Sequence, residues 1–168
     1  MTSRPDIRPF DPHDWETLRD LRLRALADAP DAFARTLAEE QGLSDEDWAR
    51  RLSEASSTAW QLSAVAEREG KPVGLAYGRL EAEGSSRAHL YSMWVAPEAR
   101  RSGVGRAIVQ AVASWARGAG ARCLELRVTE SNAAAVRLYA SQGFRSTSER
   151  SPLREGSPLL VRTLRLDL

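Results

Sequence analysis

The sequence predicts an α/β protein in which helices flank one twisted, mostly antiparallel sheet with a single parallel strand pair. The 168 residues, 42% of them hydrophobic, suffice for one core and are too few for two comfortable domains. Short polar turns at 68–70 and 84–86 separate three apolar, alternating segments, which is typical of an antiparallel meander. Further along, a strand, a helix and a strand in succession indicate a right-handed crossover and therefore one parallel pair.

The expected elements follow from hydrophobic periodicity and capping residues. Asp11, with Pro12 at the first helical position, and Ser44 are expected to cap helices, and Gly118 and Gly143 to end them. In order, the sequence predicts a strand at 7–10, helices at 11–30, 31–41 and 44–55, strands at 59–67, 72–83 and 87–95, a helix at 104–117, a strand at 122–129, a helix at 132–142 and strands at 144–149 and 159–166.

Composition argues against several classes of protein. No apolar run reaches the length of a membrane span, and the N-terminus lacks the apolar core of a signal peptide, so a cytoplasmic protein without membrane contact is expected. The single Cys123 cannot form an internal disulfide, and no Cys/His spacing indicates a metal site. No basic cluster is interleaved with aromatic residues, so nucleic-acid binding is not expected.

Charge is distributed unevenly along the chain. The net charge is +1, but residues 1–98 carry a net −6 and residues 99–168 a net +7. The basic half suits an anionic cofactor and the acidic half a cationic acceptor, although a drift of surface charge without function remains an alternative.

The central motif is the segment 100–106, between a predicted strand and a predicted helix. A helix start presents unpaired backbone N–H groups and partial positive charge, and residues without side chains let an anion approach them. Arginine can meet phosphate oxygens in a bidentate fork. The predicted ligand is a pyrophosphate, although two glycines alone also suit an ordinary loop. The predicted contacts are Arg100, Arg101, Ser102, Gly103, Val104, Gly105 and Arg106.

Two familiar phosphate loops fit this segment poorly. A P-loop needs Lys and then Ser or Thr after its last glycine, whereas Arg106-Ala107 follows Gly105. A dinucleotide fingerprint needs a small residue where Ile108 stands, although Glu130 could imitate its ribose-binding acid. A dinucleotide-binding oxidoreductase is therefore kept only as a rival.

A third pattern fits better. Arg100-x-x-Gly103-x-Gly105 after a strand resembles the acetyl-CoA pyrophosphate loop of the GNAT superfamily of N-acetyltransferases. Residues 128–144 are similar to the second half of that signature, with Asn132 opening a helix, then Leu-Tyr and Gly-Phe. The resemblance covers residues 89–144 in detail. It implies a GNAT-like fold with acetyl-CoA as acetyl donor and no metal. The expected divisions are an acceptor-side segment (1–58), a cofactor core (59–144) and a C-terminal hairpin (145–168).

The same resemblance implies a mechanism. Strands 89–95 and 122–129 would splay apart, and pantetheine would pair with main-chain groups of Met93, Trp94 and Val95. Tyr139 would protonate the leaving thiolate. Asn132 would contact the cofactor; a helix cap alone is the alternative, and the two roles are compatible. An amine would attack directly, without an acyl-enzyme, and a backbone N–H within 91–93 would stabilise the oxyanion. From spacing alone, Tyr139 could equally be a packed aromatic residue.

The general base is less closely specified. His89 begins the central strand, where some relatives in this superfamily carry a Glu or His base, and strand alternation would place Tyr91 and Met93 on its face. A partly exposed strand-end histidine is the alternative, and Glu81 and Glu83 are rival bases acting through water.

Small-molecule amines, amino acids, peptide N-termini and protein lysines all remain open as acceptors. A small molecule is favoured, because no long groove-forming insertion is visible. Expected wall residues of its site are Phe33, Glu39, Glu40 and Glu81. A non-catalytic acetyl-CoA sensor remains an alternative that would keep the loop but need no Tyr139. Exposure of the final strand, 159–166, could support a homodimer through its edge.

Overall fold

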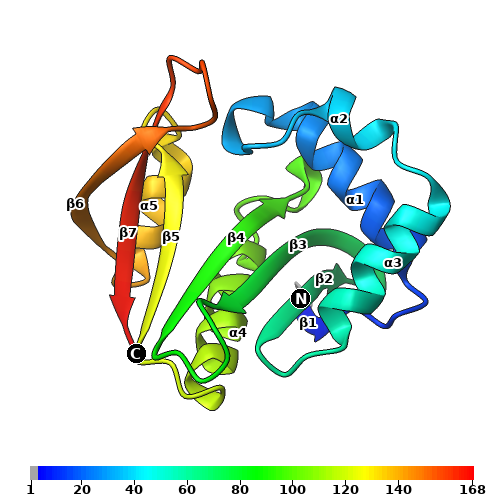
Figure 1. Ribbon diagram of the computed structural model, residues 1–168, viewed down its shortest axis with the longest axis horizontal. Coiled ribbons are helices and arrows are strands. Elements are labelled where there is room, and N and C mark those ends of the chain that lie inside the picture. Colours follow the sequence, from blue (N-terminus) through cyan, green and yellow to red (C-terminus); the bar gives the residue numbers. More distant parts are fainter. Residues whose placement is uncertain (1–3) are drawn as a thin grey trace.

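A seven-stranded sheet organises the computed structural model, which describes residues 4–168 (Figure 1). The strand order is β1-β2-β3-β4-β5-β7-β6. All neighbours are antiparallel except β4 and β5, which confirms the predicted mixed sheet with one parallel pair. The elements are β1 (Asp6–Pro9), α1 (Trp15–Asp28), η1 (Pro30–Ala32), α2 (Leu37–Gln41), α3 (Asp45–Ser56), β2 (Gln61–Arg68), β3 (Lys71–Leu80), β4 (Arg87–Val95), η2 (Pro97–Ala99), α4 (Val104–Gly118), β5 (Cys123–Thr129), α5 (Ala133–Ser141), β6 (Arg145–Pro152) and β7 (Leu160–Asp167).

Helices cover both faces of the sheet. In Figure 1, α1 and α3 lie in front of β2 and β3, and α4 lies behind them. Two glycines of β3 allow α4 to pack closely: a Cβ on Gly74 would lie 3.3 Å from Cδ1 of Ile108, and one on Gly78 would lie 2.7 Å from Cζ3 of Trp115. We call the side carrying α4 and α5 the α4 face and the opposite side the α1 face.

The first helix begins later than expected. Asp11 does not cap it; its carboxylate accepts a hydrogen bond from the backbone N–H of His13 (2.9 Å), which forms a turn. Helix α1 begins at Trp15 after Asp14. The carboxylate of Asp14 is occupied by the backbone N–H of Asp11 and by Arg8, so it makes no side-chain cap.

The helix expected over 31–41 is mostly absent. Pro30–Ala32 forms one 3₁₀ turn, Phe33 is extended, and α2 begins only at Leu37. The cause is a capping box, in which Thr36 and Glu39 bind each other's backbone N–H groups and thereby start the helix at that point.

The final strand is not an edge strand, contrary to our expectation. β7 lies between β5 and β6, and β6 forms the outer strand at that end of the sheet. A homodimer through a free edge of residues 159–166 is therefore excluded by the topology, since both sides of β7 are already paired.

The parallel pair is short, and this opens the sheet. β4 and β5 pair only from Arg87 to Leu90 and from Cys123 to Leu126. Beyond these residues the two strands diverge (Figure 1), and β5 continues against β7 alone. The resulting opening, between residues 91–95 and 127–129, is called the β4–β5 gap below.

Candidate active site

A β-bulge in β4 lies beside the gap. Tyr91 pairs with Tyr77 and Trp94 with Leu75, so Ser92 and Met93 together oppose the single residue Ala76. Ser92 has a φ of +53°, a conformation that is uncommon for residues other than glycine. A bulged residue leaves backbone polar groups unpaired, here within the stretch where an oxyanion-stabilising N–H is expected.

Because of the bulge, the expected alternation that would place Tyr91 and Met93 on the face of His89 is wrong. Tyr91 lies on the α1 face, where its ring stacks on Tyr77 with centroids 5.4 Å apart. Met93 is instead directed to the α4 face, where its Sδ accepts a hydrogen bond from the hydroxyl of Tyr139 at 3.6 Å. His89, Tyr91 and Met93 therefore do not share a face, because the inserted residue shifts the two-residue period.

The glycine-rich loop forms the N-terminus of α4 as predicted from its position. Gly103 has a φ of +88°, and a Cβ added there would meet nothing within 4 Å. A Cβ on Gly105, in contrast, would lie 3.0 Å from Cδ2 of Leu138 on α5. The first backbone N–H groups of α4 have no partner within the helix, and Gly103 supplies no side-chain cap. Arg101 and Arg106 are exposed beside them, so the loop has the features of an anion site.

Arg100 is held differently from its neighbours. Its guanidinium pairs with the carboxylate of Asp28, at the end of α1, and its Nε donates to the carbonyl of Val95 at 3.0 Å. The indole N–H of Trp94 donates to the same carboxylate at 2.9 Å. The Trp94 hydrogen bond lowers the pKa of Asp28 against the opposing effect of burial, and Arg100 lowers it further. Arg100 thus connects the loop to α1 through Asp28.

Tyr139 lies on α5 with its ring buried against the gap. Its ring meets that of Phe144 edge-on at 5.7 Å between centroids. Burial raises the pKa of Tyr139 to about 12, so the hydroxyl stays protonated at neutral pH and can donate a proton. At the start of α5, Oδ1 of Asn132 accepts from the backbone N–H of Ala135 at 3.2 Å, which confirms its capping role.

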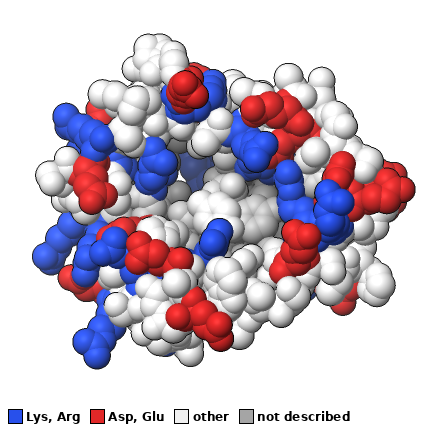
Figure 2. All heavy atoms as spheres, in the orientation of Figure 1, with Lys and Arg blue, Asp and Glu red and all other residues white. Residues whose placement is uncertain are grey.

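A cavity of about 960 Å³ opens on the α1 face, between the helices and the strands beside the gap. Figure 2 shows the hollow in the middle of this face with basic side chains around it. His89 and Tyr91 line the cavity from β4, and Ser92 reaches it at the bulge. The other lining residues are Arg22, Ala32, Phe33, Ala34, Arg35, Glu40, Arg51, Glu54, Ala55, Gln61, Tyr77, Arg79, Leu80, Glu81, Leu90, Arg127, Leu153 and Val161.

Three of the four expected acceptor-wall residues, Phe33, Glu40 and Glu81, lie at this cavity. Glu40 is buried and accepts hydrogen bonds from Arg22 at 2.9 and 3.1 Å and from Arg51 at 3.3 Å. Burial disfavours its charged form, but the two arginines outweigh this and lower its pKa. Its charge is therefore already balanced within the protein.

Glu39 does not line the cavity. Its carboxylate is exposed and accepts a hydrogen bond from the backbone N–H of Thr36 at 2.7 Å, which lowers its pKa. The physical reason is that α2 begins at Leu37 and not at residue 31, so Glu39 is the third residue of the helix and completes the capping box with Thr36.

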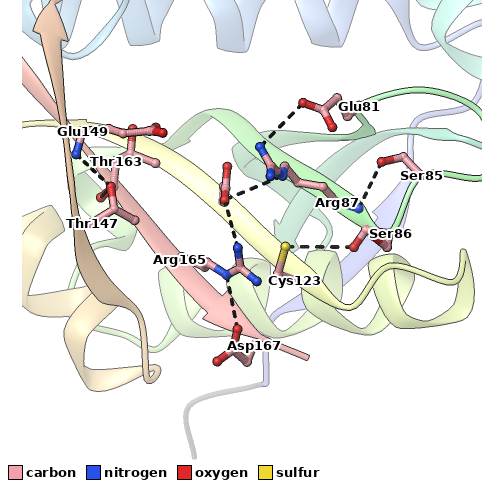
Figure 3. A network of polar contacts seen from close by, with 11 residues as sticks. Glu81, Ser85, Ser86, Arg87, Cys123, Thr147, Glu149, Thr163, Arg165 and Asp167 are labelled. Carbon is pink, nitrogen blue, oxygen red and sulfur yellow. Dashed lines mark hydrogen bonds and ion pairs between the residues drawn. The ribbon is translucent and has the colours of Figure 1, made fainter.

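His89 occupies the middle of a cross-strand row of polar residues. Its register partners are Arg79 on β3 and Glu125 on β5, and Glu125 in turn pairs with Arg165 on β7. Arg87 and Arg165, labelled in Figure 3, lie near the end of this row. Their guanidinium groups approach the carboxylate of Glu125 at 3.8 and 3.7 Å. These contacts join β4, β5 and β7 at the closed end of the gap.

Cys123, shown in the same view, is buried in β5 with its Sγ 4.0 Å from the carbonyl of Ser86. This agrees with a core position for the only cysteine. Within residues 4–168, no group of three or more His, Cys, Asp or Glu residues could hold a metal ion. Over the same residues, none of the helices combines the length and apolar character that crossing a membrane requires.

Sequence reasoning missed several residues of the site. Asp28 carried a signal, because an acidic residue at a helix C-terminus opposes the helix dipole unless it has a partner. Tyr77 and Arg79 could have been found from strand alternation once they were paired with β4. Arg22 gave no signal, because it stands among leucines in an amphipathic helix and its position at the cavity depends on how α1 packs.

The opened parallel pair thus separates the glycine-rich helix start on one face from the cavity on the other. The chain belongs to the acetyltransferase (GNAT) family, whose model matches residues 15–144. This confirms the family resemblance seen in residues 89–144.

Two curated relatives and one solved structure illustrate the similarity. The chain is 37% identical over 146 residues to a mycothiol acetyltransferase of Thermobispora bispora, matching 82% of this chain and 45% of that protein. It is 31% identical over 156 residues to an aminoglycoside N(6')-acetyltransferase of Stenotrophomonas maltophilia, with coverage of 88% and 90%. A putative acetyltransferase from Salmonella typhimurium, solved with its cofactor acetyl-CoA, superposes with a TM-score of 0.79 at 20% identity, covering 99% and 95%. The chain thus spans less than half the length of the mycothiol relative.

Proposed function

We propose that this protein transfers an acetyl group from acetyl-CoA directly to a primary amine of a small molecule. The observation that carries the proposal is the end of β4–β5 pairing at Leu90 and Leu126. The opening lies between the start of α4, which has the features of an anion site, and the cavity on the α1 face. A thioester held in the opening would be reachable by an amine in the cavity.

The loop would hold the donor. Backbone N–H groups of Gly103 to Arg106 would bind the pyrophosphate, with Arg101 and Arg106 adding charge-assisted hydrogen bonds. The open space around Gly103 suits a close approach of the pyrophosphate, and the lack of a side chain at Gly105 lets Leu138 of α5 pack against the loop. Arg100 would act by tying the loop to Asp28. Main-chain groups from Met93 to Val95 would pair with pantetheine, and the side chain of Asn132 would lie nearby.

The reaction would need two proton transfers. As the amine nitrogen bonds to the thioester carbonyl carbon and the carbon–sulfur bond breaks, Tyr139 would donate its proton to the departing thiolate. A backbone N–H at the Ser92 bulge would stabilise charge on the carbonyl oxygen. His89, at the cavity, would accept the proton released by the amine, with Glu81 as a rival base. The products are the acetamide and the free thiol of CoA.

Comparison with relatives supports the kind of acceptor. The names of the mycothiol and aminoglycoside relatives refer to small molecules, which favours a small-molecule amine here too. In the proposed division of labour, residues 1–58 contribute most of the acceptor wall, residues 59–144 the donor site and residues 145–168 the remaining wall. A cytoplasmic location remains a prediction of the sequence.

Calorimetric titration with acetyl-CoA, with NAD and ATP as controls, tests the donor. Gly103→Leu should weaken acetyl-CoA binding about tenfold or more by blocking the amides. Gly120→Leu is the matched control, because Gly120 shares the φ of +88° and the open surroundings but lies at the other end of α4. Absence of acetyl-CoA binding, or equal effects of both variants, would contradict the proposal. Binding without thiol release across an amine panel would favour the sensor alternative.

A further inference from the structure

The cavity on the α1 face is more basic than the chain's charge distribution predicts. Five arginines but three glutamates line it, so basic groups exceed acidic ones by two. The acidic first half of the sequence suggested a cationic acceptor. The carboxylates that produce that acidity lie largely elsewhere, and Glu40, which does reach the cavity, is paired with two arginines.

Arg22 holds a buried donor without a partner. Its side chain is 7% exposed and lines the cavity from α1. Nε and Nη2 donate to Glu40, and the guanidinium lies 4.9 Å from the ring centroid of Phe33. Nη1 is buried and has no hydrogen-bond acceptor among the described residues. Because a buried cationic N–H without an acceptor is unfavourable, this atom favours a ligand that supplies an oxygen.

Two further guanidinium groups that line the cavity lack a carboxylate partner within residues 4–168. Arg79, the register partner of His89, lies over the ring of Trp60 at 5.2 Å. Arg127, on β5, donates only to neutral oxygens, the hydroxyl of Ser151 at 2.5 Å and the carbonyl of Pro152 at 3.3 Å. Both line the same cavity as Arg22, so their positive charge is available to a ligand.

We infer that the acceptor amine also carries an oxyanion, a carboxylate or a phosphoryl group, which Arg22, Arg79 and Arg127 bind while the amine faces His89. This inference rests on the proposed function, since it specifies the substrate class of the same site. Guanidinium groups match the geometry of both oxyanions. The acceptor is accordingly an amino acid or an amino-phosphate compound and not a polycationic amine.

The test compares amine acceptors of different charge, among which 3-aminopropanoate and its carboxamide are matched in size. Thiol release from acetyl-CoA is measured with 3-aminopropanoate, its carboxamide, 2-aminoethylphosphonate, 1,3-diaminopropane and an aminoglycoside, each at the same concentration of unprotonated amine. The acids should show a kcat/KM about tenfold to a hundredfold above the carboxamide, the range expected for a charge-assisted hydrogen bond. Whether the carboxylate or the phosphonate reacts faster identifies the oxyanion. Equal kcat/KM values for the acids and the carboxamide, or faster reaction of 1,3-diaminopropane or the aminoglycoside, would overturn the inference.

Variants separate recognition of the anion from general damage. Arg79→Gln should remove most of the preference by raising KM for the acids alone, and Arg22→Lys should do the same while keeping a cation beside Glu40. Arg117→Gln removes an exposed charge from the last turn of α4 and should change nothing. If Arg22→Lys fails to fold, the result for Arg79→Gln decides. A preference for acids that survives Arg79→Gln would contradict the assignment.

Direct binding distinguishes the failure of this inference from the failure of the proposed function. Calorimetry with CoA present measures the affinity for 3-aminopropanoate and its carboxamide without requiring transfer. Tighter binding of the acid, lost in Arg79→Gln, would support the oxyanion site even if no amine released thiol, and only the proposed transfer would then fail. No difference in affinity between acid and carboxamide would overturn the inference.

Discussion

The two sides of the β4–β5 gap are built in opposite ways. The α4 face takes its loop, its helix start and Tyr139 from one stretch of chain between residues 93 and 139. The cavity on the α1 face takes its walls from segments spread between Arg22 and Val161. The α4 face, the proposed donor side, is therefore recognisable as a local pattern. The cavity, the proposed acceptor side, exists only after α1, the β3–β4 pair and the C-terminal hairpin meet.

The largest expected effect concerns the donor side. Tyr139→Phe removes one hydroxyl and should lower kcat by about 10²- to 10⁴-fold, the range for a positioned general acid, with little change in acetyl-CoA affinity. Steady-state kinetics and calorimetry check this. Since the pKa of Tyr139 is raised to about 12, the wild-type rate should show no decline from its ionisation below about pH 10. Unchanged turnover in the variant would reduce Tyr139 to a packed aromatic residue.

On the acceptor side, the largest effect should be on stability. Glu40→Gln leaves Arg22 and Arg51 without their carboxylate and should reduce the free energy of unfolding by about 3–5 kcal/mol. Glu39→Gln, at the adjacent exposed position, should cost less than about 1 kcal/mol, because glutamine can still complete the capping box. Denaturant unfolding measures both variants.

The wild type and the Glu40→Gln variant should also differ in how acid changes their stability. Because the pKa of Glu40 is lowered in the fold, its contribution to stability is complete above its ordinary value of 4.5 and is lost as the pH falls through the folded pKa. The Gln variant should therefore lose less stability than the wild type on acidification below about pH 4.5. Parallel pH dependences for the two proteins would show that Glu40 is not the group responsible.

A smaller effect on the rate is expected for His89, the proposed general base. His89→Ala should lower kcat/KM about a hundredfold near neutral pH, the lower end of the general-base range, because water can reach this half-buried position and take over in part. The limb of the pH–rate profile that reports the base should also move. His13→Ala, which alters the other histidine at an exposed turn, is the control. An identical pH–rate profile for His89→Ala would remove it as the base and favour Glu81.

The smallest effect, on acetyl-CoA affinity, is expected at Asp28, which links α1 to Trp94 and Arg100. Asp28→Asn weakens the contacts from Trp94 and Arg100 and should reduce acetyl-CoA affinity about fivefold, because the ion pair is partly exposed. Asp20→Asn, an exposed change on the same helix, should leave affinity unaltered. If both variants bind acetyl-CoA like the wild type, α1 does not support the donor loop.

Residues 89–144 show how far local patterns reach. The helix from Val104, the capping Asn132 and the burial of Cys123 follow from hydrophobic periodicity and helix-end chemistry, which depend on neighbours in sequence. The shift of Met93 to the α4 face does not follow in the same way. A bulge is a property of two paired strands, and nothing within residues 87–95 specifies that two of them will oppose Ala76.

The sequence by itself determined the family, the mixed sheet, the crossover with its parallel pair and the loop at the start of α4, because local periodicity, short turns and motif spacing predict each of them. The start of α2 at Leu37 was also local, because the Thr36–Glu39 capping box sets it. Tertiary structure alone decided that β7 is enclosed and that Arg22, Arg79 and Arg127 line one cavity with His89. The physical reason is that charge and hydrogen bonding in a cavity depend on which side chains meet, and net charge along the chain carries no record of that pairing. The local Thr36–Glu39 bonds and the distant Arg22–Glu40 pair show the contrast within one short segment.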